Sequence, residues 1–312
     1  MPSVRVLKAG LSTTIQDLGR VGYLALGIPI SGAMDPFSAC VANWLVGNAK
    51  EQALLEMTYT GDTLEFLKPM QIALTGANLS PKLNGAQISN WESYAVQAGD
   101  ILEFGQLVSG ARAYLALSGG VQVPLVQGSR ATYIRAKIGG FLGRTLQRGD
   151  EIFTLPSPPQ QKRLLPKKHR PLYTKETSLP ALLGTEAHYF SLQSVRRFFH
   201  STYTITKRAD RMGICLEGIA LERRLLKELV SNPLVLGSVQ VPNSGQPIVL
   251  MADRQTLGGY PKIATLLKES VVALAQMLPG HKVHFIPIKL EQAQERYKAF
   301  YENLARVQEL LK

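Results

Sequence analysis

The chain has 312 residues, of which 45% are hydrophobic and 19% charged, and its formal net charge at pH 7 is +12. A single core rarely grows beyond about 250–300 residues, so this length predicts two domains. The mean hydropathy of +0.01 and the lack of any apolar run near the roughly 20 residues that span a bilayer argue against a membrane protein. We expect a cytoplasmic protein that prefers acidic partners or anionic ligands. Nucleic-acid binding would rest on net charge alone, so no nucleic-acid partner is expected.

Residues 1–155 are predicted to form an N-terminal β part. Short stretches of β-branched and aromatic residues alternate with turn signals such as Thr60–Asp62 and Ala98–Asp100, a spacing typical of a barrel or sandwich. One helix is also predicted. Asp35 suits its N-cap, Pro36 its first position and Gly47 its end.

Residues 156–180 form the predicted boundary, a linker rich in proline and lysine. Prolines that oppose regular strand pairing surround five basic residues, Lys162, Arg163, Lys167, Lys168 and Arg170. A solvated linker is the expected structure. An arm that binds phosphate is the alternative.

Residues 181–288 are predicted to form a second β part, with helices near 191–201 and 265–278. The tail, 289–312, is predicted to be an amphipathic helix. Its seam follows a heptad repeat through Leu290, Ala293, Tyr297, Phe300, Leu304, Val307 and Leu311. Such a seam packs either on the helix's own chain or on a partner, and the sequence leaves both open.

Most motifs of strong chemical meaning are missing. The sequence has no Walker A loop, no dinucleotide-binding glycine motif, no HExxH, no CxxC and no GxSxG elbow. His281 and His284 would point to opposite faces of a strand, so no metal site is expected. The two cysteines, Cys40 and Cys215, have apolar neighbours and are interpreted as small buried side chains.

Polar residues gather instead in five glycine-rich clusters. They lie at 13–35, 74–79, 128–144, 207–213 and 238–264. The candidate substrate-binding residues within them are Gln16, Asp17, Arg20, Asn78, Arg130, Arg211, Gln240, Gln246, Gln255, Thr256, Tyr260 and Lys262. Taken singly, each residue is as well explained by a turn or a backbone hydrogen bond.

Taken together, the clusters suit a flat HN–C=O group. A glutamine or asparagine amide presents a donor and an acceptor in one plane, which matches a lactam, a urea or the ureido ring of biotin. Basic side chains or backbone N–H groups would stabilise an oxyanion on that carbonyl. Asp35 and Asp253 are the candidate bases. We therefore predict one polar pocket assembled from turns of both halves.

At these clusters the sequence resembles a known family. The segments 14–35, 42–48, 54–66, 128–150, 210–218 and 237–264 are similar to the biotin-dependent carboxyltransferase family. That family includes the C subunit of 5-oxoprolinase, the allophanate hydrolase subunit 2 family and the matching part of urea carboxylase. The resemblance implies a mainly β fold with a few helices, built from two cyclophilin-like β-barrel parts plus the C-terminal helix.

The resemblance also implies a function. It implies one component of a hydrolase, active only in a heteromeric complex with a kinase-inhibitor-related B subunit and a lactam-utilisation-type A subunit. That complex opens 5-oxo-L-proline to L-glutamate and uses ATP, for which this chain shows no site. Biotin enters only under the first alternative, a carboxyltransferase acting on urea or a related amide. The second alternative is a non-enzymatic regulator that binds a kinase inhibitor resembling the B subunit.

Overall fold

The computed structural model describes residues 1–158, 161–224 and 229–312. They form two compact units that are discontinuous in sequence. Unit 1 comprises Met1–Val21, Ser31–Tyr173 and Leu304–Lys312, and unit 2 comprises Gly22–Ile30 and Thr174–Asn303. Residues 159 and 160 of the predicted linker lie outside the described residues. The domain boundaries predicted from the sequence stay a prediction.

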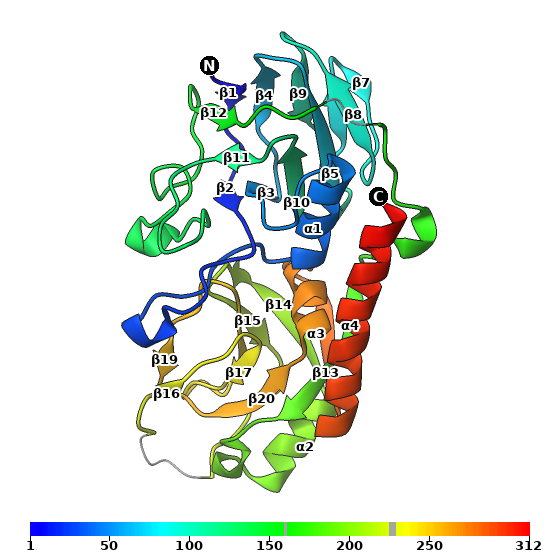
Figure 1. The fold of residues 1–312 in the computed structure, drawn as a ribbon. Coiled ribbons are helices and arrows are strands. Elements are labelled where there is room, and N and C mark those ends of the chain that lie inside the picture. Colours follow the sequence, from blue (N-terminus) through cyan, green and yellow to red (C-terminus); the bar gives the residue numbers. More distant parts are fainter. Residues whose placement is uncertain (159–160, 225–228) are drawn as a thin grey trace. The chain divides into compact units, whose positions relative to one another are not determined.

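Unit 1 is built from two antiparallel sheets (Figure 1). The first has seven strands, in the order β11 (Val121–Gln122), β12 (Glu151–Thr154), β1 (Val4–Lys8), β4 (Thr63–Phe66), β9 (Ile101–Phe104), β6 (Pro81–Leu83) and β7 (Ala86–Gln87). The second has five strands, in the order β2 (Thr13–Gln16), β3 (Leu54–Thr58), β10 (Ser109–Leu117), β5 (Met70–Asn78) and β8 (Ser93–Val96).

Apolar side chains from both sheets fill the core of unit 1. Val4 and Val6 of β1, Leu64 and Phe66 of β4, and Leu115 of β10 are all fully buried within one cluster. Successive side chains of a strand point to opposite faces, so alternate residues are available to that core. Alternate residues of β1 and β4 are therefore the ones that fill the core.

Helix α1 (Pro36–Leu45) is the predicted first helix of the chain. Asp35 is its N-cap, and one carboxylate oxygen accepts a hydrogen bond from the Ser38 N–H at 3.0 Å. Pro36 occupies the first turn, where its missing N–H costs nothing. All helix residues after Pro36 are buried, so α1 is a core element.

Unit 2 is a closed barrel of seven strands. The order around the ring is β13 (Glu176–Leu183), β20 (Lys262–Leu266), β17 (Ser238–Gln240), β18 (Ile248–Leu250), β15 (Gly213–Glu217), β14 (Thr202–Ala209) and β21 (Lys282–Pro287). The parallel pairing of β13 with β21, from Glu176 opposite Lys282 to Ala181 opposite Pro287, completes the ring. A separate pair joins β16 (Asn232–Pro233) to β19 (Leu257–Gly258). Because a closed ring has no edge strands, its backbone groups are paired all round.

Three further helices follow in chain order: α2 (Leu192–His200), α3 (Lys268–Ala275) and α4 (Leu290–Leu310). Short 3-10 turns lie at Leu24–Leu26, Ile134–Ala136, Lys167–His169 and Ala187–Tyr189. Helix α3 is shorter than the predicted 265–278, because Thr265 and Leu266 pair with β13 in the barrel. Tertiary pairing here overrides a helical pattern.

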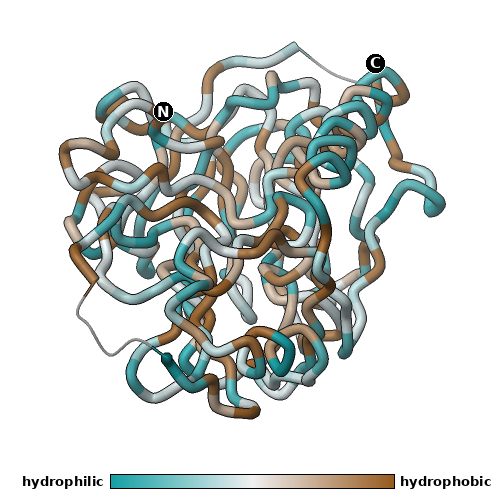
Figure 2. The backbone as a smooth tube through the Cα atoms, turned by 90° about the horizontal axis from the view of Figure 1, so that it is seen from below, coloured by the Kyte–Doolittle hydropathy of each residue, from teal (hydrophilic) through white to brown (hydrophobic). Residues whose placement is uncertain are grey.

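The predicted tail helix is confirmed, and its seam is only partly buried. Ala293, Val307 and Leu311 are buried, whereas Tyr297 remains 55% exposed. Its polar residues can be followed as teal segments beside the C-terminus in Figure 2. Within the described residues, no helix is both long and apolar enough to cross a bilayer. The predicted fold class, mainly β with a few helices and a C-terminal helix, is confirmed.

The basic stretch after residue 160 is held against unit 1. The Ser93 N–H donates to the Arg163 carbonyl at 2.9 Å, and the Leu165 N–H donates to the Trp91 carbonyl at 2.9 Å. The Arg163 side chain donates to the Trp44 carbonyl. The proline-rich composition predicted a solvated linker, because prolines oppose regular strand pairing. Residues between the prolines can still form single backbone hydrogen bonds, as Arg163 and Leu165 do.

Candidate functional site

A pocket of about 480 Å³ opens on the barrel of unit 2. Its volume lies within the range of small-molecule sites. Strands β14, β15, β17 and β18 and nearby turns supply its wall, which combines two amides, a carboxylate, a thiol, two cations and apolar side chains. The lining residues are Lys207, Arg208, Ala209, Asp210, Met212, Gly213, Cys215, Gln240, Ile248, Leu250, Gln255 and Tyr260.

Two glutamine amides converge in this pocket around a glycine. Gln240 is 3% exposed, and its Nε2 donates to the Tyr260 carbonyl at 3.1 Å. A Cβ atom placed on Gly258 would stand 2.8 Å from Gln240 Nε2 and 3.0 Å from Gln255 Nε2. The two amide nitrogens therefore approach the same bare α-carbon, and only glycine leaves room for both.

Tyr260 forms an aromatic part of the wall. The Arg223 guanidinium lies 5.8 Å from the centre of its ring, within the range of a cation–π contact. The terminal Nη2 of Arg223 also donates to the Val241 carbonyl, which fixes the stack. Burial lowers the pKa of Arg223. Tyr260 itself is 45% exposed, so part of this residue is open to a ligand.

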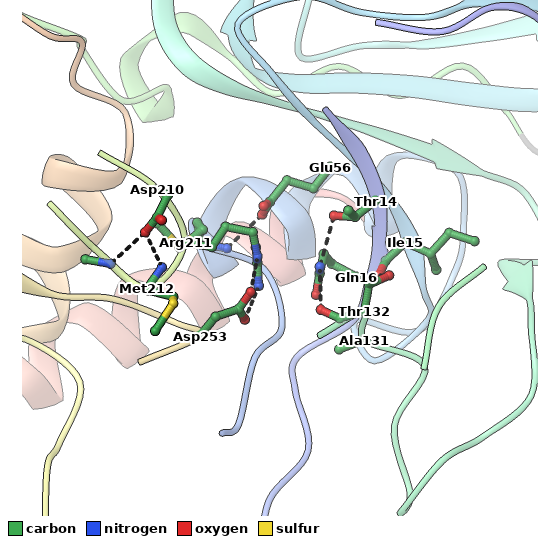
Figure 3. A network of polar contacts seen from close by, with 12 residues as sticks. Thr14, Ile15, Gln16, Glu56, Ala131, Thr132, Asp210, Arg211, Met212 and Asp253 are labelled. Atoms are coloured by element: carbon green, nitrogen blue, oxygen red, sulfur yellow. Dashed lines mark hydrogen bonds and ion pairs between the residues drawn. The ribbon is translucent and has the colours of Figure 1, made fainter. Parts of the chain in front are cut away.

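Asp210 and Cys215 contribute ionisable groups. One Asp210 oxygen accepts from the N–H groups of Met212 at 2.7 Å and Gly213 at 3.0 Å, which closes a tight turn (Figure 3). Cys215 is half-buried, in contrast to the fully buried position predicted for it, and burial raises the pKa of its thiol. A raised pKa keeps the thiol protonated, so Cys215 is a poor nucleophile.

The pair of Arg211 and Asp253 holds the Asp210 turn in place (Figure 3). The guanidinium donates to both carboxylate oxygens, at 2.9 and 3.0 Å. The side chains of Arg211 and Asp253 are only 11% and 6% exposed. The Asp253 N–H also donates to the Arg211 carbonyl at 2.7 Å. Asp253 is therefore engaged on both its backbone and its side chain, and it does not line the pocket.

Three other predicted residues of unit 2 bind the chain itself. The Lys262 ammonium lies 3.1 Å from a Glu186 carboxylate oxygen. The Gln246 amide accepts from the Gly218 N–H at 2.9 Å and donates to the Gly218 carbonyl at 3.1 Å. The Gln246 side chain thus pairs with flat amide groups, but these groups belong to the backbone at Gly218. The Thr256 carbonyl accepts from the Leu234 N–H.

In unit 1, four predicted residues organise one turn network. Gln16 Nε2 donates to the Thr14 hydroxyl at 3.0 Å and to the Thr132 carbonyl at 3.2 Å (Figure 3). Arg20 is fully buried. Asp17 accepts hydrogen bonds from Gly19, Ser129 and Arg130. Arg20 donates to the carbonyls of Val126 and Ala131. The Arg130 side chain donates to Val123 and Gln122. These hydrogen bonds give the four side chains a structural role, and substrate binding by them stays a prediction.

The remaining predicted residues of unit 1 are Asp35 and Asn78. Asp35 is fully buried, and Ser38 donates to its carboxylate through both its N–H and its hydroxyl. Asn78 accepts from the Ser80 N–H at 2.9 Å and lines a second pocket, which lies within unit 1. Of the predicted set, Gln240, Gln255 and Tyr260 share the barrel pocket. A pocket assembled from both halves stays a prediction.

Lys207, Arg208 and Asp210 line the pocket but were not among the site residues predicted from the sequence. They belong to the predicted cluster 207–213, from which only Arg211 was selected. An aspartate two residues before Met212 and three before Gly213 is a signal for a side chain that caps its own turn, and that signal would have singled out Asp210. In the described part of the chain, no group of histidine, cysteine, aspartate and glutamate side chains is placed to hold a metal ion.

Several known proteins are similar to this chain over most of its length. Residues 26–287 match the family model described as carboxyltransferase domain, subdomain A and B. The chain is 36% identical over 305 residues to the C subunit of 5-oxoprolinase from Escherichia coli, covering 97% of each. It is 30% identical to urea amidolyase of Saccharomyces cerevisiae, covering 93% of this chain and 17% of that protein. The solved Kluyveromyces lactis urea carboxylase has a TM-score of 0.93 at 29% identity, over 98% of this chain and 29% of that one.

Proposed function

Since the chain belongs to the family of the carboxyltransferase domain, subdomains A and B, we propose that it is the C subunit of an ATP-dependent 5-oxoprolinase. Acting with the A and B subunits of the complex, this hydrolase would open 5-oxo-L-proline to L-glutamate. The similarity to C subunits of 5-oxoprolinase over nearly the whole of both chains supports the proposal.

The observation that carries the proposal is the pair of amides in the barrel pocket. Gln240 and Gln255 bring two Nε2 donors to the same glycine, and an amide side chain also carries an acceptor in the same plane. A lactam presents the complementary edge, an N–H beside a C=O. The pocket volume of about 480 Å³ holds a five-membered ring with its carboxylate.

The charged residues of the wall supply the remaining chemistry. Lys207 and Arg208 are exposed cations of the lining, placed to attract the substrate carboxylate and to stabilise negative charge on the lactam oxygen. Asp210 is the carboxylate of the wall and the candidate base for a water molecule. In ring opening, water adds to the carbonyl carbon, the C–N bond breaks, and the nitrogen gains a proton. Asp253 would act through Arg211 as a positioning residue.

ATP is proposed for the complex as a whole, and no residue of this chain is assigned to it. We propose that the complex works in the cytoplasm. The proposed partners are the kinase-inhibitor-related B subunit and the lactam-utilisation-type A subunit.

The test is reconstitution. The chain, purified together with its A and B partners, should release ADP and glutamate from 5-oxoproline. Gln255→Ala should lower kcat/KM by about fivefold, since one lost hydrogen bond to substrate is worth roughly 1 kcal/mol. Gln294→Ala, an exposed glutamine of α4, is the matched control and should behave as the parent. A complete, correctly assembled complex without turnover would reject the function.

The alternative is a biotin-dependent carboxyltransferase acting on urea or a related amide. The similarity to urea amidolyase and urea carboxylase favours it, although each of those proteins is several times longer than this chain. The ureido ring of biotin carries the same HN–C=O edge, so Gln240 and Gln255 fit it too. Transfer of labelled carboxyl from a carboxylated biotin carrier to urea, in the absence of 5-oxoproline turnover, would establish this alternative.

A further inference from the structure

A second pocket, of about 580 Å³, lies entirely within unit 1. Its floor is the end of β5 and the loop before β8, including Asn78 and Trp91, and its rim is the segment from Lys167 to Tyr173. This segment is the end of the basic stretch that the sequence singled out. The proposed function does not use this pocket.

The lining carries positive charge and no carboxylate. Lys167 and Arg170 are its two cations, and neither aspartate nor glutamate occurs among the lining residues. The nearest acid along the chain is Glu92, and its carboxylate is already paired with a cation. Its carboxylate pairs with Lys162 at 3.1 Å and accepts from the Tyr94 hydroxyl. Glu92 also interacts electrostatically with Arg170, but no carboxylate lines the cavity. The lining therefore stays net positive, and it favours an anion.

The two cations have donors to spare. Arg170 Nε donates to the Leu165 carbonyl at 2.8 Å, which orients the guanidinium. Among the described residues, its terminal nitrogens and the Lys167 ammonium have no hydrogen-bond partner in the structure. Burial lowers the pKa of Arg170, as expected for a cation that has lost water without gaining a direct ion pair. A guanidinium of this kind suits two oxygens of one phosphate.

The site is held by contacts that leave little freedom. The Leu165 N–H binds the Trp91 carbonyl, and the Trp91 N–H binds the Leu74 carbonyl at 2.6 Å. Trp91 has a φ of +72°, a conformation that a bulky residue adopts only when its surroundings impose it. The Asn90 amide donates to the Ala77 carbonyl at 2.8 Å. The rim and the floor are thus tied together before any ligand arrives.

We propose that this pocket binds the phosphate group of a small phosphate ester. Arg170 and Lys167 would hold the phosphate oxygens, and the hydroxyls of Ser89 and Ser109 are further donors on the lining. The cavity exceeds what a free phosphate fills, and the apolar Ile88 and Leu172 on its wall suit the organic part of an ester. The proposal does not depend on 5-oxoprolinase activity.

Calorimetric titration of the isolated chain tests the proposal, with glycerol 3-phosphate, inorganic phosphate and glutamate as probes. Glycerol 3-phosphate should bind most tightly. Lys167→Ala should weaken its binding about tenfold or more, because a hydrogen bond to a charged group is lost. Arg170→Gln should weaken it at least as much. Lys168→Ala is the matched control, since Lys168 neighbours Lys167, is exposed and does not line the pocket. It should leave the affinity unchanged.

Several results would overturn the proposal. Equal losses in Lys167→Ala and Lys168→Ala would mean that general positive charge attracts the probe. Equal affinity for glutamate would remove the assignment to phosphate, and equal affinity for inorganic phosphate would remove the ester. Absence of binding by all three probes would remove the site. Lys167 is exposed and its side chain makes no hydrogen bond with the described residues, so Lys167→Ala stays informative even where Arg170→Gln fails to fold.

Discussion

Replacing Gly258 with alanine should damage the barrel pocket through a single added methyl group. The new Cβ atom would stand 2.8 Å from Gln240 Nε2, 2.8 Å from Leu234 Cδ1 and 3.0 Å from Gln255 Nε2. Carbon and nitrogen atoms do not approach so closely without a shift of one of them. Gln255 is exposed and swings away at little cost. Gln240 is buried and bonded to the Tyr260 carbonyl, so its displacement stretches that hydrogen bond.

Gly258→Ala should lower both the free energy of unfolding and the catalytic efficiency. Overpacking of a filled site costs about 1–3 kcal/mol of unfolding free energy. Displacement of both amides from the lactam edge removes about one net hydrogen bond, about 1 kcal/mol, which is roughly fivefold in kcat/KM of the reconstituted complex. Urea denaturation of the isolated chain measures the first quantity, and release of glutamate from 5-oxoproline measures the second.

Gly259→Ala is the control. The nearest atoms to its new Cβ would be the Leu229 carbonyl oxygen at 3.1 Å and Ser231 Oγ at 3.7 Å, and neither belongs to the pocket. This variant should lose less stability and keep its kcat/KM. If Gly258→Ala retained full kcat/KM while Gly259→Ala lost it, the assignment of the amide pair to substrate would be wrong.

Three further predictions concern buried carboxylates. Asp35→Ala should lose about 1–2 kcal/mol of unfolding free energy in urea because helix α1 loses its cap. Asp35→Asn should keep most of that free energy. A large fall in kcat for a stable Asp35→Asn variant would instead support Asp35 as the base. Asp253→Ala removes the carboxylate that pairs with the buried Arg211 guanidinium and should cost about 3–5 kcal/mol of unfolding free energy. The double change with Arg211→Ala should cost less than the two single losses added. Strict additivity in the same urea experiment would count against the pairing. Burial raises the pKa of Asp62 above its ordinary 3.8, although the hydrogen bond from the Gly10 N–H opposes this shift. As pH rises, Asp62 therefore loses its proton in the unfolded chain before it does so in the folded chain. The free energy of unfolding should fall as pH rises from about 4 to the raised pKa. Asp62→Asn should flatten that fall and raise the urea midpoint at pH 7, and an unchanged pH profile would contradict the burial argument.

Local signals in the amino-acid sequence were enough to define several elements. The cap at Asp35 with Pro36 behind it gives α1 its start, and the heptad spacing from Leu290 gives α4 its length. Short stretches of β-branched and aromatic residues between turn signals predict the strands. The glycine-rich cluster around Gly258 also predicted where Gln240, Gln255 and Tyr260 would gather.

What each polar side chain binds could be read only from the folded chain. Gln246 and Gln255 are alike in sequence context, but Gln246 closes on the Gly218 backbone and Gln255 lines the pocket. Asp253 was chosen as a base and is held by Arg211, whereas Asp210, not chosen, reaches the wall. A hydrogen-bond partner is set by contacts between strands far apart in the chain, and a single sequence carries no record of those pairings. The basic stretch near Lys167 shows the same limit: composition predicts its charge, and only packing against Trp91 turns that charge toward a cavity.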